Sequence, residues 1–372
     1  MNAVESREIL GKELNIAGIV GRNGKSTVAQ MIAHCYLALE IENQLESATD
    51  FFNKMASESY EKNVKDVIME VSECAIKEKV ASYIDFNHLI FTNSSENADS
   101  DEKWTMMRPF VALPLEKTAI INIDDENGAD LCDVTIAETL TYALNKTADI
   151  NARNIKKTMD KTVFDLYYKG SFACRTEMPY FGTYNIYNAL ATVAHFIAEG
   201  YEPARVAQLL SDLPQIEGYF DTISTDTGIK VIIDYARTPE AVTAVLKSLV
   251  AVCQGNIITV IGADGNTNAI QRAAIGKKAL AHSKQVIFTA DNPRKEAPQN
   301  IIYDMMKGSI KQNYRICIDR EKAIEIALKM AKPKDVVILL GKGHEQAQII
   351  GGKMNVFCDK TTATYLVQKF EI

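Results

Sequence analysis

The chain has 372 residues, 47% of them apolar and 24% charged, and a formal net charge of −7. This length exceeds one ordinary domain, so two domains are expected. The acidic balance argues against nucleic acid bound on a basic face. The sequence shows no apolar stretch of bilayer length and no apolar core of a signal peptide near its start. We therefore expect a soluble cytoplasmic protein that binds neither nucleic acid nor membrane.

The seven cysteines are scattered along the chain and form no CxxC pair. An odd number without metal-ligand spacing is typical of buried small side chains in a reducing compartment. The five histidines show neither a metal-ligand spacing nor the arrangement of a nucleophilic triad. The sequence thus indicates neither a disulfide framework nor a zinc site.

The most informative stretch is Leu14–Ala29, in which an apolar run breaks into a glycine turn and then a helical pattern. Glycines let backbone N–H groups point at a polyphosphate, the helix N-terminus adds partial positive charge, and Lys25 adds a full one. Ser26 or Thr27 would reach a bridging Mg²⁺. The predicted nucleotide contacts here are Gly21, Asn23, Gly24, Lys25, Ser26 and Thr27. Because Ile19 stands where the standard motif has glycine, the alternative is a glycine turn before a surface helix with a solvated lysine.

Three further apolar runs, Asp66–Val71, His88–Asn93 and Ala119–Asp125, each end in polar residues. Helical stretches lie between them, as expected for a parallel α/β sheet that binds ligands beyond the carboxyl ends of its strands. Glu70 is therefore predicted to bind Mg²⁺, the alternative being a carboxylate that points into solvent. Residues 94–118 are polar and irregular, and we expect a loop over the same edge.

The next region changes character twice before the expected domain boundary. Residues 151–182 have a mixed, strand-like pattern, with alternation in Thr162–Tyr168, and Tyr184–Glu199 is predicted as a helix. Asn185 and Asn188 share one face of that helix and are predicted to contact the nucleotide, although helix surfaces carry asparagine routinely. A second helix is expected over 203–210, and the boundary near residue 220 separates domains 1–220 and 221–372.

A second α/β series follows this boundary. A helix is expected to begin at Thr238–Pro239. A hairpin is expected through Gly351 and Gly352. The predicted strands are Lys230–Tyr235, Ile257–Ile261, Gln285–Ala290 and Asp335–Leu340. The fold class is therefore α/β, with a P-loop-type parallel-sheet domain followed by a Rossmann-like domain.

Polar clusters follow the strands of the second domain as well. Asp234 lies just before a helix N-terminus, where aspartate also serves local turn chemistry. Arg294 and Lys342 lie on loops that expose backbone and would suit a carboxylate or a phosphate. His344 and Glu345 would serve an amine substrate or form a local pair. The predicted substrate contacts are Asp291, Asn292, Arg294, Lys342, His344 and Glu345.

Eight stretches, taken in order, resemble the Mur ligases, most closely the UDP-N-acetylmuramoyl-tripeptide synthetases (MurE-type). The similarity runs from about Ile16 to about Lys360. The stretches are GIVGRNGKST, MEVSECA, DFNHLIFTN, INIDDENG, GTYNIYNALA, DYARTPEAV, TADNPR and LLGKGHEQAQIIGG. Because the chain begins close to the glycine turn, we expect it to lack the N-terminal domain that holds the UDP part in this family.

The resemblance implies an ATP-dependent enzyme that phosphorylates a carboxylate to an acyl phosphate, which an amino acid's amine then attacks. The implied catalytic residues are Lys25, Glu70 and Asp234. Ser26 and Glu70 are the implied Mg²⁺ ligands, and Arg272 is a further implied contact of ATP. The motif DNPR goes with meso-diaminopimelate in this family. It implies that Arg294 grips a carboxylate and that Glu345 holds the distal ammonium. The partners expected are this amino acid, a carboxylate acceptor and a partner protein that supplies acceptor recognition.

The sequence also departs from the family pattern. Met106 lies near the position of the family's carbamylated lysine, and Lys103 is the nearest lysine. Arg237 stands where the family has histidine, and Tyr219 where it has arginine. The alternative function is therefore a pseudo-ligase that binds ATP or a partner protein without forming amide bonds.

Overall fold

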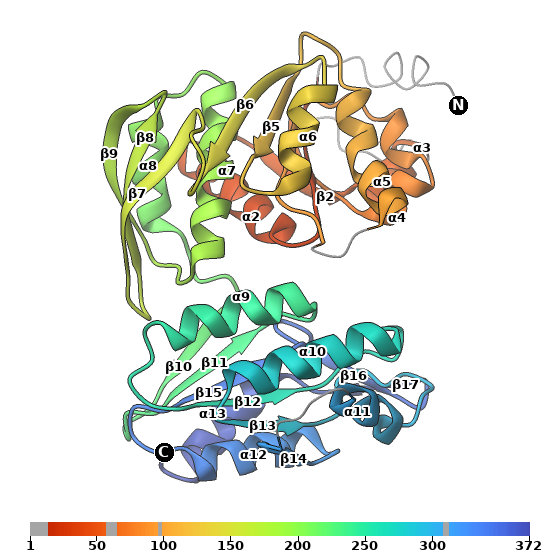
Figure 1. Ribbon diagram of the computed structural model, residues 1–372, viewed down its shortest axis with the longest axis vertical. Coiled ribbons are helices and arrows are strands. Elements are labelled where there is room, and N and C mark those ends of the chain that lie inside the picture. The colour runs from red at the N-terminus through yellow and green to blue at the C-terminus, as the bar shows by residue number, and fades with distance from the viewer. Residues whose placement is uncertain (1–13, 57–64, 96–98, 308–311) are drawn as a thin grey trace. The chain divides into compact units, whose positions relative to one another are not determined.

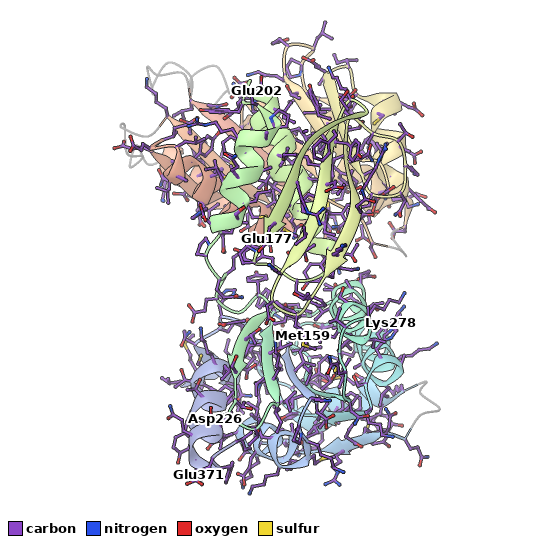
Figure 2. The ribbon with its side chains drawn as sticks, turned by 90° about the vertical axis from the view of Figure 1, so that its left-hand side faces the viewer. Met159, Glu177, Glu202, Asp226, Lys278 and Glu371 are labelled. Atoms are coloured by element: carbon purple, nitrogen blue, oxygen red, sulfur yellow. The ribbon has the colours of Figure 1, made fainter. Side chains whose placement is uncertain are left out.

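The computed structural model (Figure 1) describes residues 14–56, 65–95, 99–307 and 312–372. The chain divides into two compact units. The first unit spans Met1–Lys157, Lys161–Pro179 and Thr183–Pro214, and the second spans Thr158–Asp160, Tyr180–Gly182 and Gln215–Ile372. Met159, labelled in Figure 2, belongs to one of the two short segments that group with the second unit. The main division after Pro214 lies shortly before residue 220, where the sequence pattern placed the boundary.

The first unit is built on a nine-stranded sheet with the strand order β2-β3-β1-β4-β5-β6-β7-β8-β9. Strands β2 to β7 run parallel, whereas β8 and β9 pair antiparallel at one edge. Glu177, on the edge strand β9, is labelled in Figure 2. The strands are β1 (Asn15–Val20), β2 (Asn43–Ser47), β3 (Asp66–Val71), β4 (His88–Phe91), β5 (Thr118–Asn122), β6 (Glu138–Ala143), β7 (Ile150–Lys157), β8 (Thr162–Tyr168) and β9 (Ser171–Met178).

Helices cover both faces of this sheet (Figure 1). Alternate residues of β3, Val67, Met69 and Val71, pack into one core with Phe51 and Phe110 from two helices of the first layer. That layer comprises α3 (Ala48–Ala56), α4 (Glu73–Lys77), the 3₁₀ turn η1 (Val80–Tyr83), α5 (Ser100–Val111) and α6 (Glu126–Val134). The opposite layer comprises α2 (Lys25–Ala38), α7 (Thr183–Ala198), α8 (Pro203–Leu209) and the 3₁₀ turn η2 (Leu210–Asp212). Because successive side chains of a strand point to opposite faces of the sheet, the strands contribute to two cores, one under each helical layer.

The prediction of a loop over 94–118 was wrong for its central part, which forms helix α5. Asp99 caps this helix by accepting hydrogen bonds from the backbone N–H groups of Asp101 and Glu102. Met106 and Phe110 are buried beneath it, whereas Trp104 is 53% exposed. The polar composition therefore reflects one solvated face of a helix rather than a loop. Residues 96–98 lie outside the described part of the chain.

The second unit contains a six-stranded sheet with the order β10-β11-β15-β12-β13-β14, in which only the pair β10–β11 is antiparallel. Its strands are β10 (Asp221–Ser224), β11 (Lys230–Asp234), β12 (Ile257–Ile261), β13 (Gln285–Phe288), β14 (Tyr314–Ile316) and β15 (Val336–Leu340). One face carries α9 (Pro239–Val250), α10 (Ala269–His282) and α11 (Pro298–Met306), and the other carries α12 (Arg320–Met330) and α13 (Asp359–Lys369) (Figure 1).

The predicted strands of both units are present, within three residues of the expected ends; the largest difference is β5, which ends at Asn122 rather than at Asp125. The predicted hairpin is the separate ribbon β16 (Ala347–Ile350) and β17 (Lys353–Val356), with Gly351 and Gly352 in its turn. The predicted cap is also present, since the Thr238 side chain accepts a hydrogen bond from the N–H of Ala241. None of the helices in the described residues is long and apolar enough to cross a lipid bilayer.

Candidate functional site

The glycine turn leaves β1 and is fastened to the end of the neighbouring strand β4. Gly21 and Gly24 adopt φ values of 145° and 89°, which L side chains rarely tolerate. The Arg22 N–H donates to the carbonyl of Asn93 (2.9 Å), and the Asn23 N–H donates to the Asn93 side chain (2.9 Å). The Thr92 hydroxyl donates to the Asn23 carbonyl (2.8 Å). The polar residues at the end of β4 thus hold the turn in place before α2 begins.

Lys25, Ser26 and Glu70 lie together at the carboxyl edge of the first sheet, as the strand pattern predicted. The Ser26 hydroxyl donates to the Glu70 carboxylate at 2.8 Å. The Lys25 ammonium donates to the carbonyls of Gly21 (2.7 Å) and Arg22 (3.3 Å) within its own turn. Burial and the nearby Arg22 lower the pKa of Lys25, against the opposing effect of Glu70. Among the described residues, its ammonium contacts two backbone carbonyl oxygens and no carboxylate.

A pocket of about 390 Å³ opens beside these residues within the first unit. It is lined by Lys25, Leu45, Glu46, Ser47, Asp50, Glu70 and Ser72. Strand β2 and the start of α3 supply four of these residues. Neither element was predicted from the sequence. The polar edge strand β2 (NQLES) carries no apolar alternation, so its sequence gave no signal for either the strand or the pocket.

Of the two asparagines of α7, Asn188 lies against the glycine turn, and Asn185 is hydrogen-bonded to Asn188. The side-chain amide of Asn188 donates to the side-chain oxygen of Asn185 (3.0 Å), and both residues are buried. A Cβ added at Gly24 would come within 2.6 Å of the Asn188 oxygen, and one added at Gly21 within 2.1 Å of the Thr92 hydroxyl. The absence of side chains at these glycines is therefore what lets β4 and α7 close around the turn.

This arrangement fits a nucleotide polyphosphate with Mg²⁺. A hydroxyl and a carboxylate are the hard oxygen ligands that Mg²⁺ prefers, and one ammonium lies beside them. The turn presents the N-terminus of α2, whose first residue is Lys25, without side chains at Gly21 and Gly24 to obstruct it. Thr27 is buried, which leaves Ser26 as the better placed of the two predicted hydroxyl ligands.

A second cluster, in the second unit, follows strands β13 and β15. Lys342 is fully buried, and its ammonium donates to the Ala347 carbonyl (2.6 Å), to Glu345 (3.1 Å) and to Asn292 (3.3 Å). The Asp291 carboxylate lies 3.6 Å from the same ammonium. Burial raises the pKa of Asp291, against the opposing charges of Arg320 and Lys342. The structure thus brings together four predicted substrate residues: Asp291, Asn292, Lys342 and Glu345.

Arg294 and His344 lie at the rim of this cluster. The Asp264 carboxylate accepts two contacts from Arg294 Nε, at 2.8 and 3.1 Å, and the Arg294 side chain remains 39% exposed. Burial opposes ionisation of Asp264, but its hydrogen bond from Arg294 leaves its pKa below the usual value. The His344 ring stacks with Tyr219 (centroids 5.8 Å apart) and lies 4.9 Å from Tyr235. A stacked histidine is therefore placed for aromatic packing in this structure.

Two predicted residues, Asp234 and Arg272, form several hydrogen bonds within the protein. Asp234 accepts hydrogen bonds from the backbone N–H groups of Phe220 (2.9 Å) and Ala236 (2.8 Å), and burial raises its pKa to about 6. Arg272 is 4% exposed and forms a bidentate pair with Glu296 at 2.9 and 2.6 Å. It also contacts Asp304 at 3.1 Å. The direct roles proposed for Asp234 in catalysis and for Arg272 with the nucleotide stay predictions, and in this structure both residues hold neighbouring segments together.

Sequence reasoning assigned no site role to several residues that organise these clusters. Asn93 and Thr92 fasten the glycine turn, and the polar pair at the end of an apolar run was the available signal. Asp264 orients Arg294, and Arg237 pairs with Glu345 at 3.0 Å. These contacts join segments that are far apart in the sequence, so no local pattern predicts them.

The sequence matches the family model of the Mur ligase middle domain over residues 19–196 and that of the Mur ligase glutamate ligase domain over residues 220–343. A Parabacteroides distasonis protein named UDP-N-acetylmuramoyl-L-alanyl-D-glutamate--2,6-diaminopimelate ligase is 33% identical, over 94% of this chain and 77% of the relative. The chain belongs to the Mur ligase family. A Bacillus cereus Mur ligase of the same name is 29% identical over the same shares of the two chains.

Solved structures agree with this assignment at the level of the fold. A UDP-N-acetylmuramoyl-L-alanyl-D-glutamate--2,6-diaminopimelate ligase superposes with a TM-score of 0.67 at 23% identity, covering 99% of this chain and 82% of that one. Mycobacterium tuberculosis folylpolyglutamate synthase complexed with ADP superposes with a TM-score of 0.72 at 13% identity, covering 91% of each chain. The predicted family, α/β fold class and ligase class are confirmed. Membership in the Mur ligase family implies use of ATP.

Proposed function

We propose that this Mur ligase uses ATP and Mg²⁺ to join a carboxylate acceptor to the amine of an amino acid. The observation that carries the proposal is the group formed by Lys25, Ser26 and Glu70 on the glycine turn, with the Ser26–Glu70 contact at 2.8 Å. The names of the relatives support 2,6-diaminopimelate as the amino acid to test first and a UDP-muramoyl dipeptide as the acceptor.

In this proposal, the first unit binds and activates the phosphoryl donor. Lys25 would transfer its hydrogen bonds from the turn carbonyls to phosphate oxygens, where its charge opposes the charge that develops during phosphoryl transfer. Ser26 and Glu70 would hold Mg²⁺, which supplies positive charge to the polyphosphate. Asn188 keeps the turn in shape by packing against Gly24. The pocket beside Lys25 and Glu70 is the proposed site for the acceptor carboxylate.

The second unit supplies the residues proposed to bind the amine substrate. Arg294 is half-exposed, and within the described part of the chain no hydrogen-bond partner is assigned to its two terminal nitrogens, since Asp264 engages Nε alone. A guanidinium held in this way presents a fork that suits a carboxylate. A partner protein that supplies acceptor recognition stays a prediction.

The proposal is tested by phosphate release from ATP and Mg²⁺, measured with a panel of amino acids, with and without the UDP-muramoyl dipeptide. We expect turnover that requires both an amine and a carboxylate, with an amide product detected by mass spectrometry. Tight ATP binding without turnover on any pair would contradict the ligase proposal and favour the pseudo-ligase. The comparisons lend that alternative no support, because the relatives described above are named as ligases.

A further inference from the structure

The carboxylate of Glu345 has little capacity left for a ligand's ammonium. One oxygen accepts a hydrogen bond from Arg237 Nη2 at 3.0 Å. The other accepts from the Asn292 amide at 2.7 Å and from the Lys342 ammonium at 3.1 Å. Burial alone would raise the pKa of Glu345, but these donors outweigh burial and lower it. Glu345 is therefore an ionised group whose charge is balanced by two cations of its own chain.

Arg237 is held firmly in this position. Its guanidinium lies over the ring of Tyr235, 3.7 Å from the ring centroid, and a cation in that position is attracted by the ring's electrons. The residue precedes Thr238, which caps α9, so its backbone is tied to the start of a helix. The Arg237 side chain is 35% exposed, whereas the Lys342 ammonium behind Glu345 has no exposure. Of the two cations that contact Glu345, Arg237 is thus the one exposed to a ligand.

The guanidiniums of the cluster are more exposed than its carboxylates. Asp264 accepts hydrogen bonds from Arg294, and Asp291 is 2% exposed. The two guanidiniums, Arg294 and Arg237, are the more exposed members of their pairs, at 39% against 10% for Asp264 and 35% against 23% for Glu345. Planar guanidiniums backed by carboxylates are suited to bind carboxylates of a ligand.

We propose that Arg237 is a specificity-determining residue, which closes Glu345 to a distal ammonium so that the site recognises its amine substrate through carboxylates alone. This inference rests on the proposed function. The substrate class is an amino acid with two carboxylates, whose second amine, where there is one, adds nothing to recognition. This assignment differs from the prediction that Glu345 holds the distal ammonium of diaminopimelate, because Arg237 already donates to one Glu345 oxygen while Asn292 and Lys342 donate to the other.

The test compares two amines of the same length, meso-diaminopimelate and 2-aminoheptanedioate, which has both carboxylates but lacks the distal amine. We measure kcat/KM for both enantiomers of the second compound, with phosphate release as the readout. The wild-type protein is expected to use the two amines within about threefold of each other, because an ammonium near the solvated rim without a free partner contributes little. A preference for diaminopimelate of more than about tenfold would overturn the inference.

The Arg237→Met variant should free one oxygen of Glu345. We expect it to prefer diaminopimelate by about tenfold to a hundredfold, the value of one hydrogen bond to a charged group. The double variant Arg237→Met with Glu345→Gln should lose that preference again. Arg237→Gln, a polar substitution that also removes the cation, provides a second variant should the methionine disturb packing on Tyr235. An unchanged ratio in both single variants would contradict the inference.

The matched control is Arg237→Lys, which retains the positive charge and is expected to keep the wild-type ratio. General destabilisation of the protein does not change the ratio of the kcat/KM values for two substrates, because the fraction of active protein cancels in that ratio. Absence of turnover with every amine would overturn the proposed function and this inference with it. Turnover that strongly prefers diaminopimelate in the wild type would overturn this inference alone.

Discussion

The two units each place a lysine after a glycine at the carboxyl end of a parallel strand, yet the two lysines have different surroundings. Lys25 follows Gly24 and, within the part of the chain that the structure describes, donates to two carbonyls of its own turn. Lys342 follows Gly341, is fully buried, and contacts Glu345, Asn292 and the Ala347 carbonyl. One ammonium has partners that a ligand can replace, and the other is part of a permanent network.

This difference shows how a binding charge is distinguished from a structural one. A charge that binds a polyphosphate must be available, so its partners in the unliganded protein are weak acceptors. A charge buried without ligand access must be balanced within the protein, because an unpaired buried ion costs several kcal/mol. By this criterion Lys25 belongs to a ligand site, and Lys342 organises the groups around it.

The largest effect is expected when the permanent network is broken by Lys342→Met. Removing the ammonium leaves Glu345 and the buried Asp291 without their shared cation, and such changes cost about 3–5 kcal/mol. We expect the free energy of unfolding of the second unit to fall by this amount in urea titrations followed by hydrogen exchange. A loss below about 1 kcal/mol would show that the network is not structural.

Lys25→Ala should have the opposite profile, with a large effect on activity and a small one on stability. Loss of one charge-stabilising donor lowers turnover by about 10²–10³-fold. The free energy of unfolding should change by about 1 kcal/mol or less, since only hydrogen bonds to turn carbonyls are lost. Unchanged nucleotide affinity and turnover would contradict the assignment of the turn as a phosphate site. Arg22→Ala serves as a control for removal of a nearby positive charge.

Acid should change the contributions of two buried histidines in the first unit and of Asp234 in the second unit in opposite directions. Burial lowers the pKa of His88 to about 4 and that of His195 to about 3, so both are neutral when folded. The unfolded chain takes up these protons near pH 6.5, so their contribution to the stability of the first unit falls by a few kcal/mol as the pH drops from about 6.5 towards 4.

Asp234 makes the contrasting contribution in the second unit. Its pKa of about 6 lies above the unfolded value, so the folded unit retains a proton that the unfolded chain releases. Its contribution to the free energy of unfolding therefore rises as the pH falls from about 6 to about 4. Hydrogen exchange on peptides of each unit measures both slopes. The variants His195→Gln and Asp234→Asn should each reduce the slope of their own unit, and slopes unchanged by these variants would contradict the assignment.

The smallest effect is expected at the rim of the second cluster. Arg294→Ala should raise the KM of the amine substrate about tenfold, because one guanidinium–carboxylate contact is lost at a half-exposed position. ATP affinity, measured by calorimetry, should stay the same. If ATP affinity fell as much as amine affinity, the separate roles of the two clusters would be wrong.

Much of the fold was readable from the sequence because buried parallel strands leave a local signal. The run DVIMEV is apolar except at Asp66 and Glu70. It forms β3, in which four residues are 0–1% exposed: Val67, Ile68, Met69 and Val71. The polar edge strand β2 and the amphipathic helix α5 lacked that signal and were missed. Burial on both faces is visible in sequence, whereas half-burial at an edge depends on what packs against it.

The sequence by itself determined the glycine turn, the Lys-Ser pair, the acidic end of β3 and the order of motifs that shows the family, because each is a local pattern along the chain. Only the tertiary structure decided which charges are available. Glu345 and Arg237 lie more than a hundred residues apart, and so do Tyr36 and His195 in the first unit. Whether a carboxylate or an ammonium is free for a ligand depends on what the folding of distant segments brings to it, and no local pattern encodes that.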